Sequence, residues 1–445
     1  MHSTSRRLVF YLLVTSFIVG GFYAVFSVFG LTIDTGGTFV RTGSLFVAAV
    51  PRDADLFLED TLAEERPGFL SGGTLVKNLA PRTYEVRVER EGRVPWRAAL
   101  PITSGLVTRA TDVFLWPREA SSTLFALRVD SFSLSAGIPL MKISGGGLFL
   151  EKTRVPGEEI EYASNDSATL ITRSGNTLSW VRTGPASATV NLTALFHTLK
   201  ERDLKLPGIV PLTAVRPHPF SAGKFLITTE TSLYMLDTRR ISLERLVTIN
   251  DIAATDFGET EVLLLSDDGD LTAVDLVFKT VDTVPFVSST IARFARAADG
   301  AAIVTLTEGK TLTAYERATG AHITIAENVS EFSIAPGSVR LAYVSGGSIA
   351  VYFLGTYAGD TFIPRGHVIT VWEGNTEPRG LAWNSALPRY LFFLEDGALT
   401  ALEVGFYGER NNVVLAEGVR DFTVAGYSAY VLKNDDTLLT LSFEE

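Results

Sequence analysis

The chain has 445 residues, which suggests two or three domains, and 46% hydrophobic with 20% charged residues indicates globular rather than disordered protein. Its net charge of −11 and the absence of any basic stripe argue against a nucleic-acid partner. The chain has no cysteine, which excludes disulfides, thiolate metal sites, cysteine nucleophiles and a lipidated cysteine anchor.

The N-terminal segment predicts a membrane anchor over residues 1–34. Residues 8–33, "LVFYLLVTSFIVGGFYAVFSVFGLTI", contain no charged side chain, and about 20 such residues cross a bilayer. Arg6 and Arg7 precede the run and Asp34 follows it, so the positive-inside rule predicts a single-pass protein of the cytoplasmic membrane with its N-terminus inside and residues 34–445 exported. A cleaved signal peptide is the alternative, although the run is long and lacks a small-x-small cleavage site.

Three small residues in this run lie four apart: Ser16, Gly20 and Ala24. Such spacing lets two helices approach closely in a membrane, which would give a homo-oligomer. The alternative is ordinary helix composition with no pairing.

Residues 35–118 predict a small β-sandwich. In "TYEVRVEREGRVPWRAALPI" (83–102), Tyr84, Val86 and Val88 alternate with charged residues, as in a half-buried strand that enters a hairpin. "GSLFVAAVP", "ADLFLED" and "GLVTRATDVFLWP" predict further strands. Trp96 and Trp116 are expected in the core rather than at a contact surface.

Two of these segments resemble the PEGA domain, a small sandwich of bacterial surface proteins. "VPRDADLFLED" (50–60) is similar to the P-x-G-A strand start of that family, and "LVKNLAPRTYEVRVEREGRVPW" (75–96) is similar to its leucine–proline–tyrosine hairpin with a Glu-Gly turn. The resemblance covers residues 38–117 and implies a non-catalytic envelope interaction domain.

Residues 158–445 repeat one short pattern seven times and predict a seven-bladed β-propeller. The pattern is a turn, a small polar residue, an apolar anchor and a polar–apolar continuation. The anchors are Leu178, Leu233, Leu271, Leu312, Ile349, Leu399 and Leu438. A unit of about 40 residues with four short strands is typical of a propeller blade. "LTAYERATGAHI" (312–323) is similar to a quinoprotein-type blade, but only once.

The seventh unit ends after its third strand, so an N-terminal strand is expected to complete it. Residues 119–157 form a linker that holds this closing strand. Either 122–132 or 145–155 could supply it, and the second is favoured because it directly precedes the first repeat.

No catalytic motif, cofactor site or metal site is expected. Asp267, Asp268 and Asp270 suit a tight turn better than calcium, and the histidines lack metal-ligand spacing. No G-x-S-x-G elbow occurs, and the only Gly-Gly-Gly precedes a strand rather than a helix.

The expected function is therefore non-catalytic binding or scaffolding of a protein or glycan partner in the envelope. The insertions 197–212 and 355–368 are the candidate contact loops, with Tyr357, Phe362 and Trp372 as candidate anchors. These insertions could instead pack beside the ring or against the sandwich. The rival hypothesis is a propeller glycosidase or quinoprotein-like oxidoreductase that uses channel-mouth carboxylates such as Asp256, Glu259 and Glu395.

Overall fold

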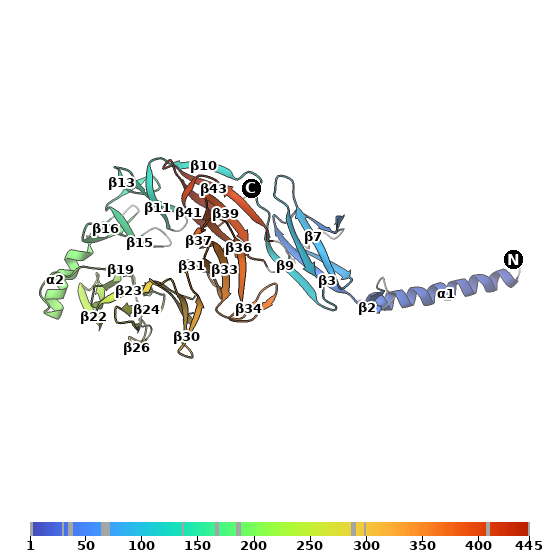
Figure 1. Ribbon diagram of the computed structural model, residues 1–445, viewed down its shortest axis with the longest axis horizontal. Coiled ribbons are helices and arrows are strands. Elements are labelled where there is room, and N and C mark those ends of the chain that lie inside the picture. Colours follow the sequence, from blue (N-terminus) through green and yellow to red (C-terminus); the bar gives the residue numbers. More distant parts are fainter. Residues whose placement is uncertain are drawn as a thin grey trace.

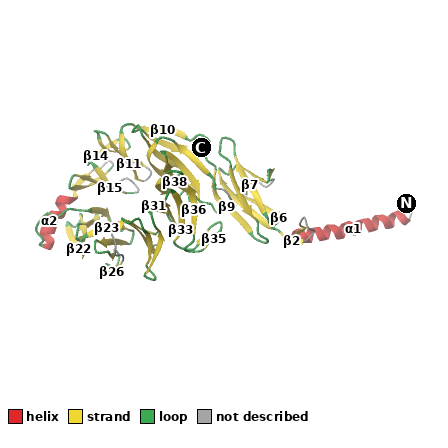
Figure 2. Cartoon of the chain, in the orientation of Figure 1, coloured by secondary structure: helices red, strands yellow, loops and turns green. Residues whose placement is uncertain are grey.

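The computed structural model describes residues 3–28, 31–33, 39–63, 72–135, 138–164, 169–183, 188–285, 291–297, 300–405 and 410–443. Figure 1 shows three parts in line: an N-terminal helix, a pair of sheets and a large assembly of sheets. Strands dominate the last two parts (Figure 2). The chain is therefore nearly all β.

The first part is helix α1 (Ser3–Val28), followed by the short hairpin of β1 (Leu31–Ile33) and β2 (Phe39–Arg41). Among the residues that the structure describes, no helix is both long and apolar enough to cross a bilayer. A span needs about 20 consecutive apolar residues in one helix, and the described helices do not supply one. By this finding the predicted transmembrane anchor, and the cytoplasmic-membrane localisation that followed from it, are wrong.

The residues assigned to the anchor all lie on α1. Ser16 and Gly20 are exposed, and a Cβ added at Gly20 would meet nothing within 4 Å. The side chains of Arg6, Arg7 and Ala24 lie outside the described residues.

Two sheets then face each other across one core. The first sheet has the order β6-β3-β9, and the second has the order β5-β4-β7-β8. Their strands are β3 (Gly43–Val50), β4 (Asp55–Leu58), β5 (Thr61–Leu62), β6 (Thr74–Leu79), β7 (Thr83–Glu89), β8 (Trp96–Pro101) and β9 (Val107–Phe114). In β7, Tyr84, Val86 and Val88 are buried in that core, as the alternation predicts. We call this unit, residues 39–116, the sandwich.

The remaining strands form eight four-stranded antiparallel sheets in the described part of the chain. The first four sheets consist of β11 (Val129–Ser135), β12 (Ile138–Ile143), β13 (Gly147–Leu150) and β14 (Thr153–Val155); β15 (Glu159–Ala163), β16 (Thr169–Ser174), β17 (Thr177–Arg182) and β18 (Ala188–Asn191); β19 (Ala214–Pro217), β20 (Lys224–Thr228), β21 (Ser232–Asp237) and β22 (Ser242–Thr248); and β23 (Ile252–Phe257), β24 (Glu261–Ser266), β25 (Asp270–Asp275) and β26 (Val281–Pro285).

The other four follow in the same way. They consist of β27 (Ile291–Arg296), β28 (Ala302–Thr307), β29 (Leu312–Glu316) and β30 (Ala321–Ala326); β31 (Val329–Ile334), β32 (Arg340–Ser345), β33 (Ser348–Phe353) and β36 (Val368–Glu373); β37 (Arg379–Trp383), β38 (Tyr390–Glu395), β39 (Ala398–Glu403) and β40 (Asn412–Ala416); and β41 (Val419–Ala425), β42 (Ser428–Lys433), β43 (Leu438–Ser442) and β10 (Ser121–Ala126).

Apolar packing joins these sheets into a closed ring. Each sheet shares one hydrophobic cluster with the sheet before it and another with the sheet after it. The last cluster joins Val129 and Met141 of the first sheet to Leu432 and Leu438 of the last. First strands of consecutive sheets also contact each other, as at β31 and β37. Radial sheets that pack side by side around an axis are a β-propeller.

The blade count corrects the sequence prediction. All seven predicted anchor residues are at most 3% exposed, but residues 129–155 form an eighth blade before them. Leu148 in β13 occupies the anchor position of that blade and is 3% exposed. This added blade is shorter than the other seven, because tight turns join its strands. Its length therefore differs from the repeat of about 40 residues that the sequence pattern follows.

The ring is closed by β10, not by the favoured segment 145–155. Thr123 of β10 pairs with Thr440 of β43 in an antiparallel register that runs from Ser121 to Ala126. Segment 145–155 is instead occupied within its own blade. The less favoured candidate, 122–132, thus contains the closing strand.

The insertion at residues 197–212 contains part of a helix that the sequence pattern did not predict. Helix α2 (Leu192–Leu204) begins at Asn191, whose side-chain oxygen accepts the Ala194 N–H at 2.8 Å, a standard N-cap. Phe196 and Leu199 are buried between the second and third blades. Within the insertion 197–212, Leu199, Lys200 and Leu212 are buried, whereas most of the other side chains are exposed.

Candidate functional site

Topology places half of the propeller loops on one face. Because the strands of each blade are antiparallel, loops from strand one to two and from strand three to four emerge together. The sandwich contacts these loops in three blades, at Asp360, Arg389, Asn411 and Phe443. We call this the sandwich face.

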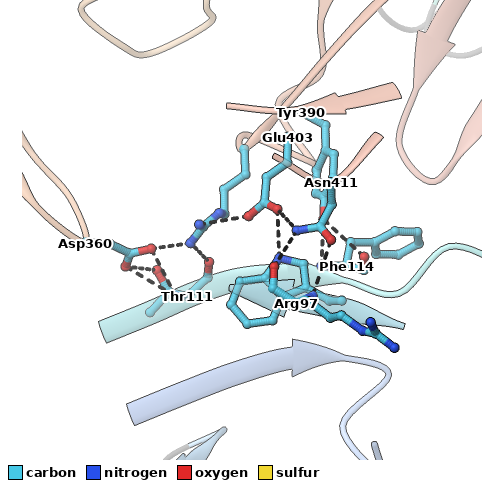
Figure 3. A network of polar contacts seen from close by, with 9 residues as sticks. Arg97, Thr111, Phe114, Asp360, Tyr390, Glu403 and Asn411 are labelled. Carbon is cyan, nitrogen blue, oxygen red and sulfur yellow. Dashed lines mark hydrogen bonds and ion pairs between the residues drawn. The ribbon is translucent and has the colours of Figure 1, made fainter. Parts of the chain in front are cut away.

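A buried charge network fixes the sandwich to this face (Figure 3). Arg389 forms ion pairs with Asp360 and with Glu403, and its Nη1 donates to the Thr111 carbonyl at 2.7 Å. Asp360 also accepts the Thr111 hydroxyl at 2.7 Å. Arg389 is 7% exposed and Glu403 2%. Buried charges need such compensation, so loss of one partner is costly.

Glu403 links the two units a second time. One of its oxygens accepts the Trp96 indole N–H at 2.7 Å and the Asn411 amide at 2.6 Å. The Asn411 amide also donates to the Arg97 carbonyl at 3.1 Å (Figure 3). The contacts of Trp96 and Arg97 join a sandwich strand to the blade of β37–β40, and the Asn411–Glu403 bond connects the two acceptors within that blade.

Aromatic packing completes the junction. Trp116 lies in the hydrophobic cluster of the last two blades, with Tyr390 and Phe443 at 5.2 and 5.0 Å between ring centroids. Burial and the Glu403 carboxylate raise the pKa of the Tyr390 hydroxyl, so it stays protonated and donates to the Phe114 carbonyl at 3.1 Å. Sandwich and propeller therefore share one interior at this point.

The three predicted contact residues do not form one group. Tyr357, in the hairpin of β34 (Tyr357–Ala358) and β35 (Phe362–Ile363), packs at 5.9 Å from Phe353 and under Arg340. Phe362 in the same hairpin is 71% exposed. Trp372 lies in β36 and packs against Phe393 at 5.4 Å. Asp360 ties this insertion to the sandwich.

The carboxylates of the enzyme hypothesis occupy different surroundings. Asp256 forms an ion pair with Arg296 at 3.0 Å, and Arg296 also pairs with Glu261 at 3.2 Å. Glu259 is exposed in the loop that joins β23 to β24, and it lines a cavity of about 660 Å³ together with Asp256, Glu261 and Arg296. Glu395 lies two blades from that cavity, at the end of β38. Within the described chain, no three histidine or acidic side chains gather to hold a metal.

Exposed apolar loop tips lie on the sandwich face as well, in the blades that are farthest from the sandwich. They lie in the loops of residues 217–224, 237–242 and 275–281, in the third and fourth blades, which Figure 1 shows at the end of the propeller opposite the sandwich. Phe220 is 57% exposed, Ile241 51%, Val277 55% and Phe278 79%. We call these four residues the apolar tips.

The three loops that carry the tips adjoin one another. Lys279 donates to Glu244 at 2.7 Å across the two blades, and both line a cavity of about 150 Å³ with His218. Burial and the nearby Lys224 and Lys279 lower the pKa of His218. The loops 217–224 and 275–281 therefore share one small polar cavity through His218 and Lys279.

A second cavity, of about 310 Å³, lies between the second and third blades on the same face. Trp180, Arg182, Lys224, Phe225 and Arg239 belong to its lining. The Arg182 guanidinium lies 5.3 Å from the Trp180 ring centre. We call this cavity the basic pocket.

Sequence reasoning missed both features because loop tips and turn residues look alike in a single chain. One signal was present: "LVFKT" (276–280) puts Val277 and Phe278 into a hairpin turn, where polar residues and glycine normally stand. "DTRRIS" (237–242) similarly puts an isoleucine in a turn.

No family model and no curated protein matches the chain. Three of the solved structures that it resembles are Saccharomyces cerevisiae Sqt1 (12% identity, TM-score 0.46), the computationally designed Ika8 protein (12%, 0.45) and the Mitotic Checkpoint Complex (10%, 0.39). The matches cover 74%, 73% and 62% of this chain and 98%, 98% and 87% of those chains. Likeness at this level carries no functional argument, and the PEGA resemblance stays a prediction.

Proposed function

We propose that the protein is a non-catalytic binding platform whose propeller presents the apolar tips to a partner protein. The sandwich is held on one part of the sandwich face, and the apolar tips project from another. Exposed apolar side chains that gather on adjoining loops are typical of protein-binding surfaces. The PEGA-like sandwich would act as a fixed second module, consistent with the surface role that the resemblance implies.

The observation that carries this proposal is the backbone of Ile241. Its φ of +50° lies in the left-handed region, which is unfavourable for a β-branched residue and is adopted readily by glycine. Folding alone would favour glycine or asparagine at this turn. A strained, exposed isoleucine at this turn is unfavourable for folding alone, which supports a role for it in binding.

The test is affinity capture with the full chain and three matched variants. Phe220→Ser/Phe278→Ser removes two tips. Ile209→Ser removes another exposed apolar side chain (87%), from the segment after α2 and outside the apolar tips, and Phe362→Ser tests the sequence-derived candidate. All of these side chains are exposed, so thermal unfolding of the variants should match wild type.

The expected result is one protein that wild type and Ile209→Ser retain, that Phe220→Ser/Phe278→Ser loses, and that binds again when both proteins are pure. Equal capture by all variants would refute the proposal, as would a partner lost equally with Ile209→Ser. Capture that depends on Phe362 instead would move the contact surface to the β34–β35 hairpin and refute the assignment to the apolar tips.

A further inference from the structure

The basic pocket differs in charge from the protein around it. Residues 159–248, which contain the second and third blades, carry ten basic and eight acidic residues, whereas the whole chain carries thirty-nine and fifty. Arg182, Lys224, Arg239 and Arg240 all lie at strand ends or loops of the sandwich face. This part of an acidic protein therefore carries a small excess of positive charge, and four of its cations lie on the sandwich face.

Among the described residues, the cations of the basic pocket form no ion pair, although Asp237 lies opposite Lys224 in the strand register and interacts with it electrostatically. In the cavity of about 660 Å³, Arg296 and Arg317 are held in ion pairs by Asp256 and Glu261. Across the described residues, by contrast, no carboxylate forms an ion pair with Arg182, Lys224 or Arg239. The carboxylate on the 237–242 loop, Asp237, accepts the backbone N–H groups of Arg239 and Arg240 at 2.9 Å each.

The pocket wall holds one further unused donor. The indole Nε1 of Trp180 is buried and has no hydrogen-bond partner in the described structure. Buried donors are normally satisfied. A carboxylate that enters the pocket could meet the guanidinium groups and approach this wall, because carboxylate oxygens accept several hydrogen bonds at once.

The loop 217–224 connects the pocket to the apolar tips. Its residues Pro217, His218, Ser221 and Lys224 line the basic pocket, and Phe220 at its tip is exposed to solvent. A ligand that fills the pocket and continues along this loop thus passes Phe220. Ile241 and Val277 are aliphatic tips, which suit apolar side chains rather than the hydroxyl-covered faces of a sugar.

We infer that the basic pocket and the apolar tips together bind a peptide segment of a partner protein in which acidic and apolar residues alternate. Glutamate or aspartate carboxylates bind in the basic pocket beside Arg182 and Arg239, and the apolar side chains pack on Phe220 and Ile241. This inference rests on the proposed function and specifies the chemistry of the partner.

The probe is the peptide fluorescein-Glu-Glu-Leu-Glu-Glu-Phe-amide, labelled at its N-terminal amine, and its glutamine analogue carries the same label. Each peptide is titrated with the full chain and followed by fluorescence anisotropy. Arg182→Gln/Arg239→Gln removes two pocket cations. Arg128→Gln/Arg379→Gln is the matched control, since both arginines are exposed beside first strands on the opposite face and the net charge changes equally.

We expect the acidic peptide to bind, the glutamine analogue to bind at least tenfold more weakly, and Arg182→Gln/Arg239→Gln to weaken binding by about tenfold. The control variant should bind as wild type does, and binding should weaken as salt rises. No binding of the acidic peptide, or equal loss in both variants, would overturn the inference. A heparin hexasaccharide that binds more tightly and depends on the same arginines would overturn the peptide assignment.

The failures of the two proposals are distinguishable. If a captured partner depends on Phe220 and Phe278 but is unaffected by Arg182→Gln/Arg239→Gln, the platform stands and the acidic-peptide inference fails. If the acidic peptide binds as expected but no protein is captured through the apolar tips, the pocket stands and the proposed function fails.

Discussion

The Glu403 carboxylate makes a specific stability prediction, because it joins the sandwich to the propeller. Glu403→Ala removes an ion pair with Arg389 and the acceptor of both Trp96 and Asn411. Breaking a buried ion pair by removal of one partner costs about 3–5 kcal/mol. Arg389 keeps Asp360 as a second partner, so the lower end of this range applies.

The buried indole of Trp96, 3% exposed, loses its acceptor as well. An unpaired buried donor costs about 1–3 kcal/mol. The free energy of unfolding of Glu403→Ala should therefore fall by about 4 kcal/mol in total. Glu403→Gln keeps a neutral acceptor for Trp96 and should cost about 2 kcal/mol.

The assay is equilibrium urea unfolding followed by far-ultraviolet circular dichroism. A double-mutant cycle of Glu403→Ala with Trp96→Phe should give a coupling energy of about 1–2 kcal/mol, since the two side chains are in direct contact. Glu59→Gln, which removes a carboxylate from an exposed pair with Arg82, is the control and should change nothing measurable. If Glu403→Ala lowered the free energy of unfolding by less than about 1 kcal/mol, or if the coupling energy were near zero, the claim that the sandwich and the propeller share one buried interior at Glu403 would be refuted.

Three further predictions concern the ring, its loops and its pH dependence. Replacement of β10 (Ser121–Ala126) by a Gly-Ser repeat should lower the melting temperature sharply, because that strand closes the ring; an unchanged melt would place the closure elsewhere. Ile241→Gly should raise the free energy of unfolding by about 1 kcal/mol, because glycine relieves the backbone strain at this position. The same change should weaken capture of the partner. A loss of stability would contradict the claim that Ile241 is strained. Burial and the nearby Lys200 lower the pKa of His197, so the free energy of unfolding is highest above pH 6.5 and decreases as the pH falls below that value. His197→Leu should flatten this decrease between pH 7.5 and 5. An identical slope in the variant would exclude His197 as its source.

The propeller was largely predictable from sequence because each blade buries a local hairpin. The seven anchors recur at 37 to 55 residues, and a strand pattern with that period has few other structural solutions. The eighth blade was missed for a physical reason. Leu148 precedes Leu178 by only 30 residues, since the first blade has minimal turns, and its third and fourth strands were taken for a closing segment.

The junction could not be predicted in the same way. Trp96 and Glu403 are separated by 307 residues, so no local periodicity relates them. The preference of Trp96 and Trp116 for a core was correctly expected, but Trp116 packs in the propeller rather than in the sandwich. The exposure of Phe220 and Phe278 could not be predicted, because the exposed fraction of a loop side chain depends on the neighbouring loops, and only the assembled ring brings those loops together.

The position of β10 has a consequence for how the chain folds as it emerges from the ribosome. Thr123 is synthesised more than 300 residues before its partner Thr440, and contacts so distant in sequence form late. Until the last blade is made, β10 has no partner strand and Arg93 of the sandwich lacks the Phe443 carbonyl as an acceptor. The last residues of that blade thus complete both the ring and this contact of the sandwich, and before then an unpaired β10 is open to pairing with strands of other chains.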